Sequence, residues 1–193
     1  MTAEVLRREP PQAPVDTSGR GLLSIEQLVL AVLPALFVSA SVGEEIEDKT
    51  TAYLWSRPIP RWSILAGKLV ALVPIAIALQ LVSLAVATLA GWGHLPSAAS
   101  FAGFAVAVIA VSAIATGIST LVPRYGMALT MFYMLLFDLV IGELPASLRE
   151  ISITAQAREI ASHGDVVQAV VMMAIVGGVW LGIALWRVRR IEA

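Results

Sequence analysis

Residues 69–123 read LVALVPIAIALQLVSLAVATLAGWGHLPSAASFAGFAVAVIAVSAIATGISTLVP and contain no Asp, Glu, Lys or Arg. As a single helix this run would be about 80 Å long, whereas the hydrocarbon core of a bilayer is about 30 Å thick. The run must therefore fold back on itself, and the Gly- and Pro-containing stretch 91–97 is the natural turn. We predict two membrane spans here, at about 64–90 and 99–121.

The composition of the whole chain agrees with a membrane protein. Of its 193 residues, 58% are hydrophobic and 14% are charged, against about 45–50% and 25% in soluble domains. The net charge of −1 gives no positive field for a nucleic acid backbone, so nucleic acid is excluded as a partner. The absence of cysteine excludes disulfides and thiolate metal sites.

The apolar segments outside this run complete an all-α polytopic fold of about five transmembrane helices. Residues 1–20 are rich in charge and proline, which predicts a flexible polar tail. The remainder, 21–193, is long enough for a single transmembrane domain. Pro34 should kink the first span. The three further spans are predicted at about 22–43, 126–143 and 166–186.

The distribution of Lys and Arg predicts the orientation of these spans. If the loop at 43–63 is cytoplasmic, eight basic residues lie inside: Lys49, Arg57, Arg61, Lys68, Arg124, Arg187, Arg189 and Arg190. The five that lie outside are Arg7, Arg8, Arg20, Arg149 and Arg158. The bias is stronger when the N-terminal tail is set aside. We therefore expect an integral protein of the cytoplasmic (inner) membrane of a bacterium.

The loop and its flanks, residues 43–68, read GEEIEDKTTAYLWSRPIPRWSILAGK, and their pattern predicts a short amphipathic helix along the inner membrane surface. Two prolines then stop the helix before the chain enters the next span. Lipid-binding helices usually carry Lys and Arg on the polar face. An acidic face is better suited to a basic protein partner. Its four carboxylates are Glu44, Glu45, Glu47 and Asp48.

This segment resembles the first cytoplasmic loop of type-2 ABC transporter permeases. In that family an acidic stretch, a Gly-Thr, a short helix, a Ser-Arg-Pro and a Gly-Lys recur in this order between two spans. Here the same order is carried by the acidic run 44–48, Thr50, Ser56-Arg57-Pro58 and Gly67-Lys68, with Lys49 in place of the usual glycine. A looser likeness covers 133–163, similar to the span and outer loop before the last span in some of these permeases.

The resemblance implies a permease subunit, expected to be an exporter, whose loop is a coupling helix seated on a separate ABC ATPase. That partner would bind and hydrolyse ATP, so no cofactor and no enzymatic activity are expected in this chain. A second permease copy or paralogue would complete the path. Family members usually have six spans, so the resemblance implies a first span that this sequence does not show, with a mis-called start, a shortened subunit and a partner that supplies the helix as the open explanations. The implied coupling residues are Glu44, Glu45, Glu47, Asp48, Thr50, Tyr53, Leu54, Arg57 and Arg61.

Two features near the predicted outer end have a functional and a structural interpretation. Asp138 is a carboxylate inside a span, which suggests a transport path or gate. It also lies only five residues from Glu143, so it could sit at headgroup level. The stretch 144–165 predicts a short amphipathic helix on the outer surface, which either caps the exit path or connects two spans.

Two patterns of small or flexible residues occur in the later spans. Ala174, Gly178 and Gly182 form a small-xxx-small ladder that allows close helix contact, within the subunit or between subunits. Met127, Met131 and Met134 share one helix face, which favours packing or lipid contact over a metal path.

Two alternatives belong to other functional classes. A small membrane anchor or assembly protein could dock a cytosolic partner through the acidic helix 44–55. An intramembrane enzyme is disfavoured, because the chain has no H-E-x-x-H, no G-x-S-x-G and no phosphate-binding loop.

Overall fold

The computed structural model describes residues 17–47, 61–144, 147–161 and 166–192, and in these ranges all regular structure is helical. Five helical segments are long and apolar enough to cross a membrane. Their limits lie within four residues of the predicted spans. They are Ile25–Gly43, Trp62–Trp92, Ala98–Leu121, Pro123–Glu143 and Val166–Arg190.

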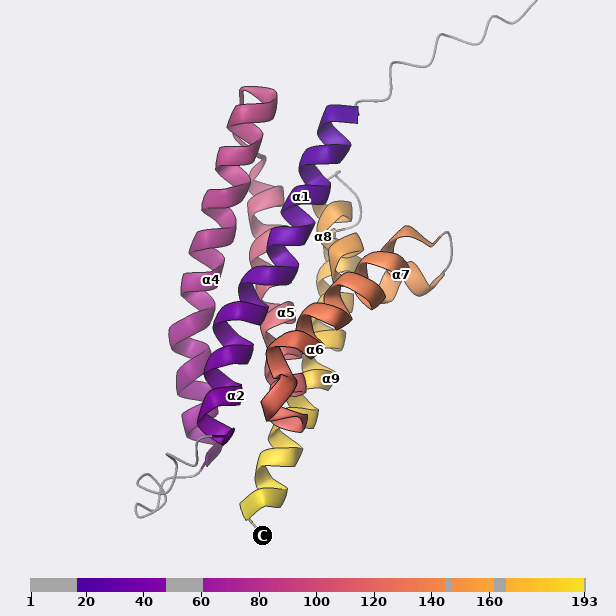
Figure 1. Cartoon of the computed structure of the whole chain (residues 1–193). Helices are drawn as coiled ribbons and strands as arrows, with labels where there is room; N and C mark the ends of the chain where they lie inside the picture. The colour runs from indigo at the N-terminus through magenta and orange to yellow at the C-terminus, as the bar shows by residue number, and fades with distance from the viewer. Residues whose placement is uncertain (1–16, 48–60, 145–146, 162–165, 193) are drawn as a thin grey trace, which may run out of the picture.

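Each crossing is built from one or more helices (Figure 1). The first crossing comprises α1 (Thr17–Pro34), the π-helix η1 (Ala35–Ser39) and α2 (Ala40–Glu47). The second and third are α4 (Arg61–Trp92) and α5 (Ala98–Leu121). The fourth comprises the 3-10 turn η2 (Pro123–Tyr125), α6 (Gly126–Phe132), the π-helix η3 (Tyr133–Asp138) and α7 (Leu139–Glu143). After η4 (Ser147–Ile151) and α8 (Ile153–Ala161), the chain crosses again as α9 (Val166–Glu192).

The fold-back inside the uncharged run occurs where the sequence predicts it, between α4 and α5. Gly93 adopts a positive φ of 71°, a conformation that glycine reaches without steric cost. Ser97 then caps α5, because its hydroxyl accepts a hydrogen bond of 3.1 Å from the amide of Ser100. Figure 1 shows α4 and α5 running side by side as a long hairpin.

The central helix of the bundle is α5, which contacts α4, α8 and α9. Its small side chains allow neighbouring helices to approach closely, since packing between membrane helices depends on van der Waals contact. At Gly117, an added Cβ would lie 2.6 Å from the Trp180 ring of α9. The fourth crossing runs obliquely to these helices in Figure 1, with its η2 end beside α2.

Both π-helices interrupt crossings that hydropathy alone presents as simple helices. Pro34 has no N–H to donate to the turn before it, and η1 begins at the next residue. The predicted kink at Pro34 is therefore a local change in helix type. The second π-helix, η3, ends at Asp138. Each of them places one buried polar side chain, Ser39 or Asp138, among the crossings.

Two predictions about the ends of segments need correction. Thr17–Arg20, assigned to the flexible tail, form the first turn of α1, because extending an existing helix adds one hydrogen bond per residue. The outer amphipathic helix exists as α8, but it packs against α5 and α9 and does not lie on the surface. Six of its nine residues are buried.

The two patterns in the later spans are arranged differently in the structure. Gly178 and Gly182 of the small-residue ladder have no neighbouring atom within 4 Å of an added Cβ. That ladder therefore faces away from the bundle, while Gly177 contacts Ala110 of α5. Of the three methionines, Met134 is fully buried, whereas Met127 is 37% exposed.

Candidate functional site

The predicted coupling segment, residues 44–61, is described only at its two ends. The helix α2 continues the first crossing as far as Glu47, so Glu44, Glu45 and Glu47 are helical. Arg61 is the first residue of α4. The predicted residues Asp48, Thr50, Tyr53, Leu54 and Arg57 lie outside the described residues. Both ends of the segment lie at the same end of the molecule as the C-terminus of α9 (Figure 1).

The two described ends are fixed to the bundle by close contacts. The Lys68 ammonium of α4 donates a hydrogen bond to the backbone carbonyl of Ser41 in α2. On the opposite side, α2 packs against η2. Gly43 is essential to that contact, because an added Cβ would lie 2.7 Å from the carbonyl oxygen of Pro123. A displacement of the segment would therefore be transmitted to both α4 and the fourth crossing.

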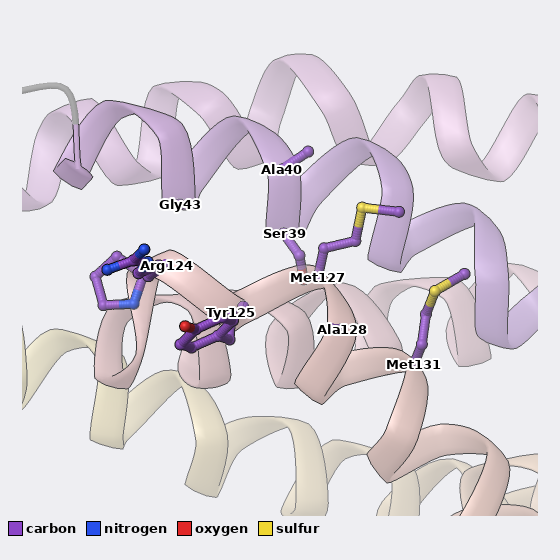
Figure 2. Close-up of a pocket in the computed structure, with 10 residues that line it drawn as sticks. Ser39, Ala40, Gly43, Arg124, Tyr125, Met127, Ala128 and Met131 are labelled. Atoms are coloured by element: carbon purple, nitrogen blue, oxygen red, sulfur yellow. The ribbon is translucent and has the colours of Figure 1, made fainter.

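A cavity of about 350 Å³ opens beside this contact, between the first and fourth crossings. Figure 2 shows Arg124 and Tyr125 at one end of it and the side chains of Met127 and Met131 extending toward α1 and η1 at the other. Its lining residues are Ser39, Ala40, Gly43, Pro123, Arg124, Tyr125, Gly126, Met127, Ala128 and Met131. None of these is acidic.

Ser39, which is 1% exposed, lines the cavity and connects the first crossing to the fourth. Its hydroxyl lies 2.8 Å from the hydroxyl of Thr130 in α6. Thr130 in turn donates to the Gly126 carbonyl over 2.7 Å. A hydrogen bond between membrane helices contributes about 0.6 kcal/mol on average. The Ser39–Thr130 pair therefore fixes the register of η1 against α6 and adds only a little to the stability of this contact.

Asp138 lies where η3 meets α8, and its carboxylate holds the start of α8. It accepts hydrogen bonds from the amides of Ile153 (2.8 Å) and Thr154 (3.0 Å) and from the Thr154 hydroxyl (2.6 Å). Ser152 caps the same helix by accepting from the Ala155 amide over 3.1 Å. The carboxylate is 4% exposed. Its placement favours a structural role, and its role in a transport path stays a prediction.

A second buried carboxylate, Glu26, joins α1 to α4. Its two oxygens accept hydrogen bonds from the Ser83 hydroxyl and the Gln80 amide, each over 3.0 Å. Both partners are neutral. The next residue, Gln27, donates to the Thr154 carbonyl over 3.3 Å. Consecutive side chains of α1 therefore connect to α4 on one side and to α8 on the other.

Glu26 stands at the start of the uncharged run 27–43, and that position alone does not identify it as a packing residue. One pattern could have identified it. Gln80 is the only amide side chain in the uncharged run 69–123, and a buried amide in a membrane requires a polar partner. The partner of Gln80 is expected among the polar residues at the edges of neighbouring spans, and Glu26 is one of these residues.

The described side chains offer no metal-binding cluster. Among them, no group of three or more His, Asp or Glu residues could hold a metal ion. The functional groups of the cavity lining are one cation, one phenol, one hydroxyl and two thioethers. The expectation that ATP binds to a partner subunit stays a prediction.

Comparison with known proteins gives one match. The model of the family described as ABC-2 family transporter protein matches residues 10–184. This range covers the first four crossings, most of the fifth and the segment 44–61. Neither the comparison with curated proteins nor the comparison with solved structures gave a match.

Proposed function

Because this chain belongs to the ABC-2 family of transporter proteins and is a membrane permease component of an ABC transporter, we propose that it drives export with ATP hydrolysed by a separate subunit. The ATPase docks on residues 44–61 at the cytoplasmic face of the inner membrane. Docking places the acidic residues against basic groups of the ATPase. A second copy or a paralogue completes the transport path.

The observation that carries this proposal is the attachment of the two ends of the segment. A coupling loop has to transmit a push from the ATPase to the helices around the path. The Lys68 bond to Ser41 and the contact of Gly43 with Pro123 connect the loop ends to three crossings. These rigid contacts support the transmission of force, because packed interfaces switch between arrangements and do not deform continuously.

The roles of the individual residues follow from their chemistry. Glu44, Glu45, Glu47 and Asp48 supply the charge that a basic groove recognises. Tyr53 and Leu54 fill the groove, where aromatic and aliphatic anchors contribute most of the binding energy. The sequence spacing predicts Thr50 on the same helical stripe as Tyr53 and Leu54, and Arg57 and Arg61 are proposed to hold the segment at the membrane face.

The experiment is an affinity purification of the tagged chain from its native membranes in mild detergent. The four acidic residues 44, 45, 47 and 48 are changed to lysine together in one variant. A matched control changes four other acids, Glu4, Glu9, Asp16 and Glu192, to lysine. We expect mass spectrometry to identify an ABC ATPase with the parent and with the control, and its loss with the first variant. Equal recovery with all three proteins would refute docking through the acidic residues.

A further inference from the structure

The side chains that line the cavity between the first and fourth crossings change in type from one end to the other. The permease function does not explain this change. Its lining changes from cationic and aromatic at Arg124 and Tyr125 to thioether at Met127 and Met131. These residues follow one another along η2 and α6, so the change runs along the crossing. With a rise of 1.5 Å per residue, Met131 lies about 10 Å further along the crossing than Arg124.

From this order we propose that the cavity binds an anionic phospholipid of the inner leaflet. The Arg124 guanidinium holds the phosphate, and the first part of an acyl chain lies along Met127 and Met131. The proposal rests on the orientation given under the proposed function, which puts Arg124 at the cytoplasmic surface. A lipid of that leaflet has its headgroup at the surface and its chains deeper, the same order as the lining.

The charge of the cavity supports an anion over a neutral or cationic ligand. Arg124 is exposed, and its guanidinium lies 5.7 Å from the centre of the Tyr125 ring. No lining residue is acidic. A guanidinium can bind two phosphate oxygens at once, and basic pockets between membrane helices on the cytoplasmic side are typical sites for anionic headgroups.

The size and shape of the cavity support a lipid over a small soluble anion. A volume of about 350 Å³ exceeds what an inorganic phosphate needs and falls in the range of small-molecule sites. Methionine side chains are unbranched and flexible, so they adapt to an irregular chain. The apolar end of the cavity has no function for a soluble anion, whereas an acyl chain requires it.

The position of the site gives the bound lipid a mechanical consequence. Ser39 and Ala40 of the first crossing form one wall, and Gly126 and Ala128 of the fourth form the other. A lipid in the cavity therefore bridges the two crossings beside the Gly43 contact with Pro123. We expect bound lipid to raise the thermal stability of this pair of crossings.

The test uses the purified full chain, depleted of lipid, in native mass spectrometry with added lipid. Phosphatidylglycerol is compared with phosphatidylcholine of the same acyl chains. Three variants are compared with the parent. Arg124→Gln removes the charge, Ala40→Phe fills the cavity and keeps the charge, and Arg187→Gln removes an exposed arginine from the same end of the molecule outside the cavity.

We expect the parent to bind phosphatidylglycerol more tightly than phosphatidylcholine. Loss of one charge-assisted contact in Arg124→Gln should weaken phosphatidylglycerol binding about tenfold or more, while Arg187→Gln stays within about twofold. Ala40→Phe should weaken both lipids, and its gel-filtration profile shows whether it is folded. Equal phosphatidylglycerol binding by the parent and Arg124→Gln overturns the proposal, as does complete competition by glycerol 3-phosphate, which has no acyl chain.

If Ala40→Phe does not fold, the position of the bound lipid is measured by photocrosslinking. Phosphatidylglycerol with a photoreactive group on one acyl chain is crosslinked to the parent, and the labelled peptides are mapped. Labelling within 39–43 or 127–131 supports the proposal, and labelling confined to the second, third or fifth crossing overturns it. Recovery of the ATPase with Arg124→Gln is measured in parallel. We expect it unchanged, so loss of lipid binding and loss of ATPase docking are distinguishable.

Discussion

Asp138 shows how a carboxylate is accommodated at the end of a membrane span. The cost of burying it is offset by two backbone amides and a hydroxyl at the start of α8. Those amides would otherwise be unsatisfied, because the first turn of a helix has no internal partners for its N–H groups. The carboxylate therefore stabilises the helix that it contacts.

Replacing Asp138 tests this role directly. Asp138→Ala leaves the amides of Ile153 and Thr154 buried without a partner, so we expect a loss of about 2–4 kcal/mol of stability. Asp138→Asn keeps one acceptor and should lose less. Thermal unfolding of the purified protein in detergent measures both. Glu143→Gln is the control, since its carboxylate is 68% exposed and its pair with Arg158 should contribute little. Equal unfolding temperatures for Asp138→Ala and the parent would contradict the structural role.

Glu26 leads to a different expectation, because its hydrogen-bond partners carry no charge. Glu26→Gln keeps the size of the side chain and an acceptor oxygen for Ser83 while removing the charge. Its new NH2 group can donate to the Oε1 of Gln80, which has no partner among the described residues of the parent, once the Gln80 amide turns over. We expect stability equal to or above that of the parent. Glu26→Ala leaves the amide of Gln80 without its acceptor and should cost about 1–3 kcal/mol. The same unfolding assay distinguishes them, and a large loss with Glu26→Gln would show that the negative charge itself is needed.

At the scale of elements, the contact between α2 and η2 depends on the absence of a side chain at Gly43. Gly43→Ala would place a Cβ 2.7 Å from a backbone oxygen, so one element has to move. Overpacking of this kind costs about 1–3 kcal/mol, more than the gain of about 0.5–1 kcal/mol from replacing glycine in a helix. We expect a lower unfolding temperature and weaker recovery of the ATPase.

Gly67 provides the matched control for that variant. It lies in α4 near the other end of the segment, and an added Cβ would meet nothing within 4 Å. Gly67→Ala should therefore be neutral or slightly stabilising, with the ATPase recovered as in the parent. If the two alanine variants behave alike, close packing of α2 on η2 is not what matters at Gly43.

The elements differ in how far the sequence predicts them. The crossings follow from long apolar segments with few charges, and the α4–α5 turn follows from Gly93 and its neighbours. The π-helices η1 and η3 are not evident from hydropathy. The burial of α8 is not evident either. It depends on the Asp138 carboxylate, which lies 15 residues before Ile153 in the sequence and accepts a hydrogen bond from the Ile153 amide in the first turn of α8.

The same limit applies to the candidate sites. Charge pattern and spacing single out the acidic segment, whereas the cavity forms between residues 39–43 and 123–131 only once the two crossings pack together. Likewise, the partner of Glu26 is more than 50 residues away in the sequence. A local sequence pattern is therefore better suited to predicting a segment that binds a partner than to predicting a contact between distant parts of the same chain.

For the whole molecule, the distribution of Lys and Arg makes a testable prediction of orientation. The chain contains no cysteine, so single-cysteine variants report position without background. His94→Cys lies in the exposed turn after α4, and Arg187→Cys is exposed near the end of α9. We expect a membrane-impermeant maleimide to label His94→Cys in intact cells and to label Arg187→Cys only after the membrane is permeabilised. The reverse pattern would invert the topology and move the acidic segment away from cytosolic ATP.

Docking of an ATPase on the segment between the first two crossings can be detected in native membranes by site-specific photocrosslinking. One variant carries p-benzoylphenylalanine in place of Tyr53, within the segment. The other carries it in place of Leu95, an exposed residue in the turn at the opposite end of α4. Irradiation of native membranes should crosslink an ABC ATPase, identified by mass spectrometry, to position 53 and not to position 95. An ATPase crosslinked only to position 95, or to neither position in a membrane-inserted protein, would contradict the account.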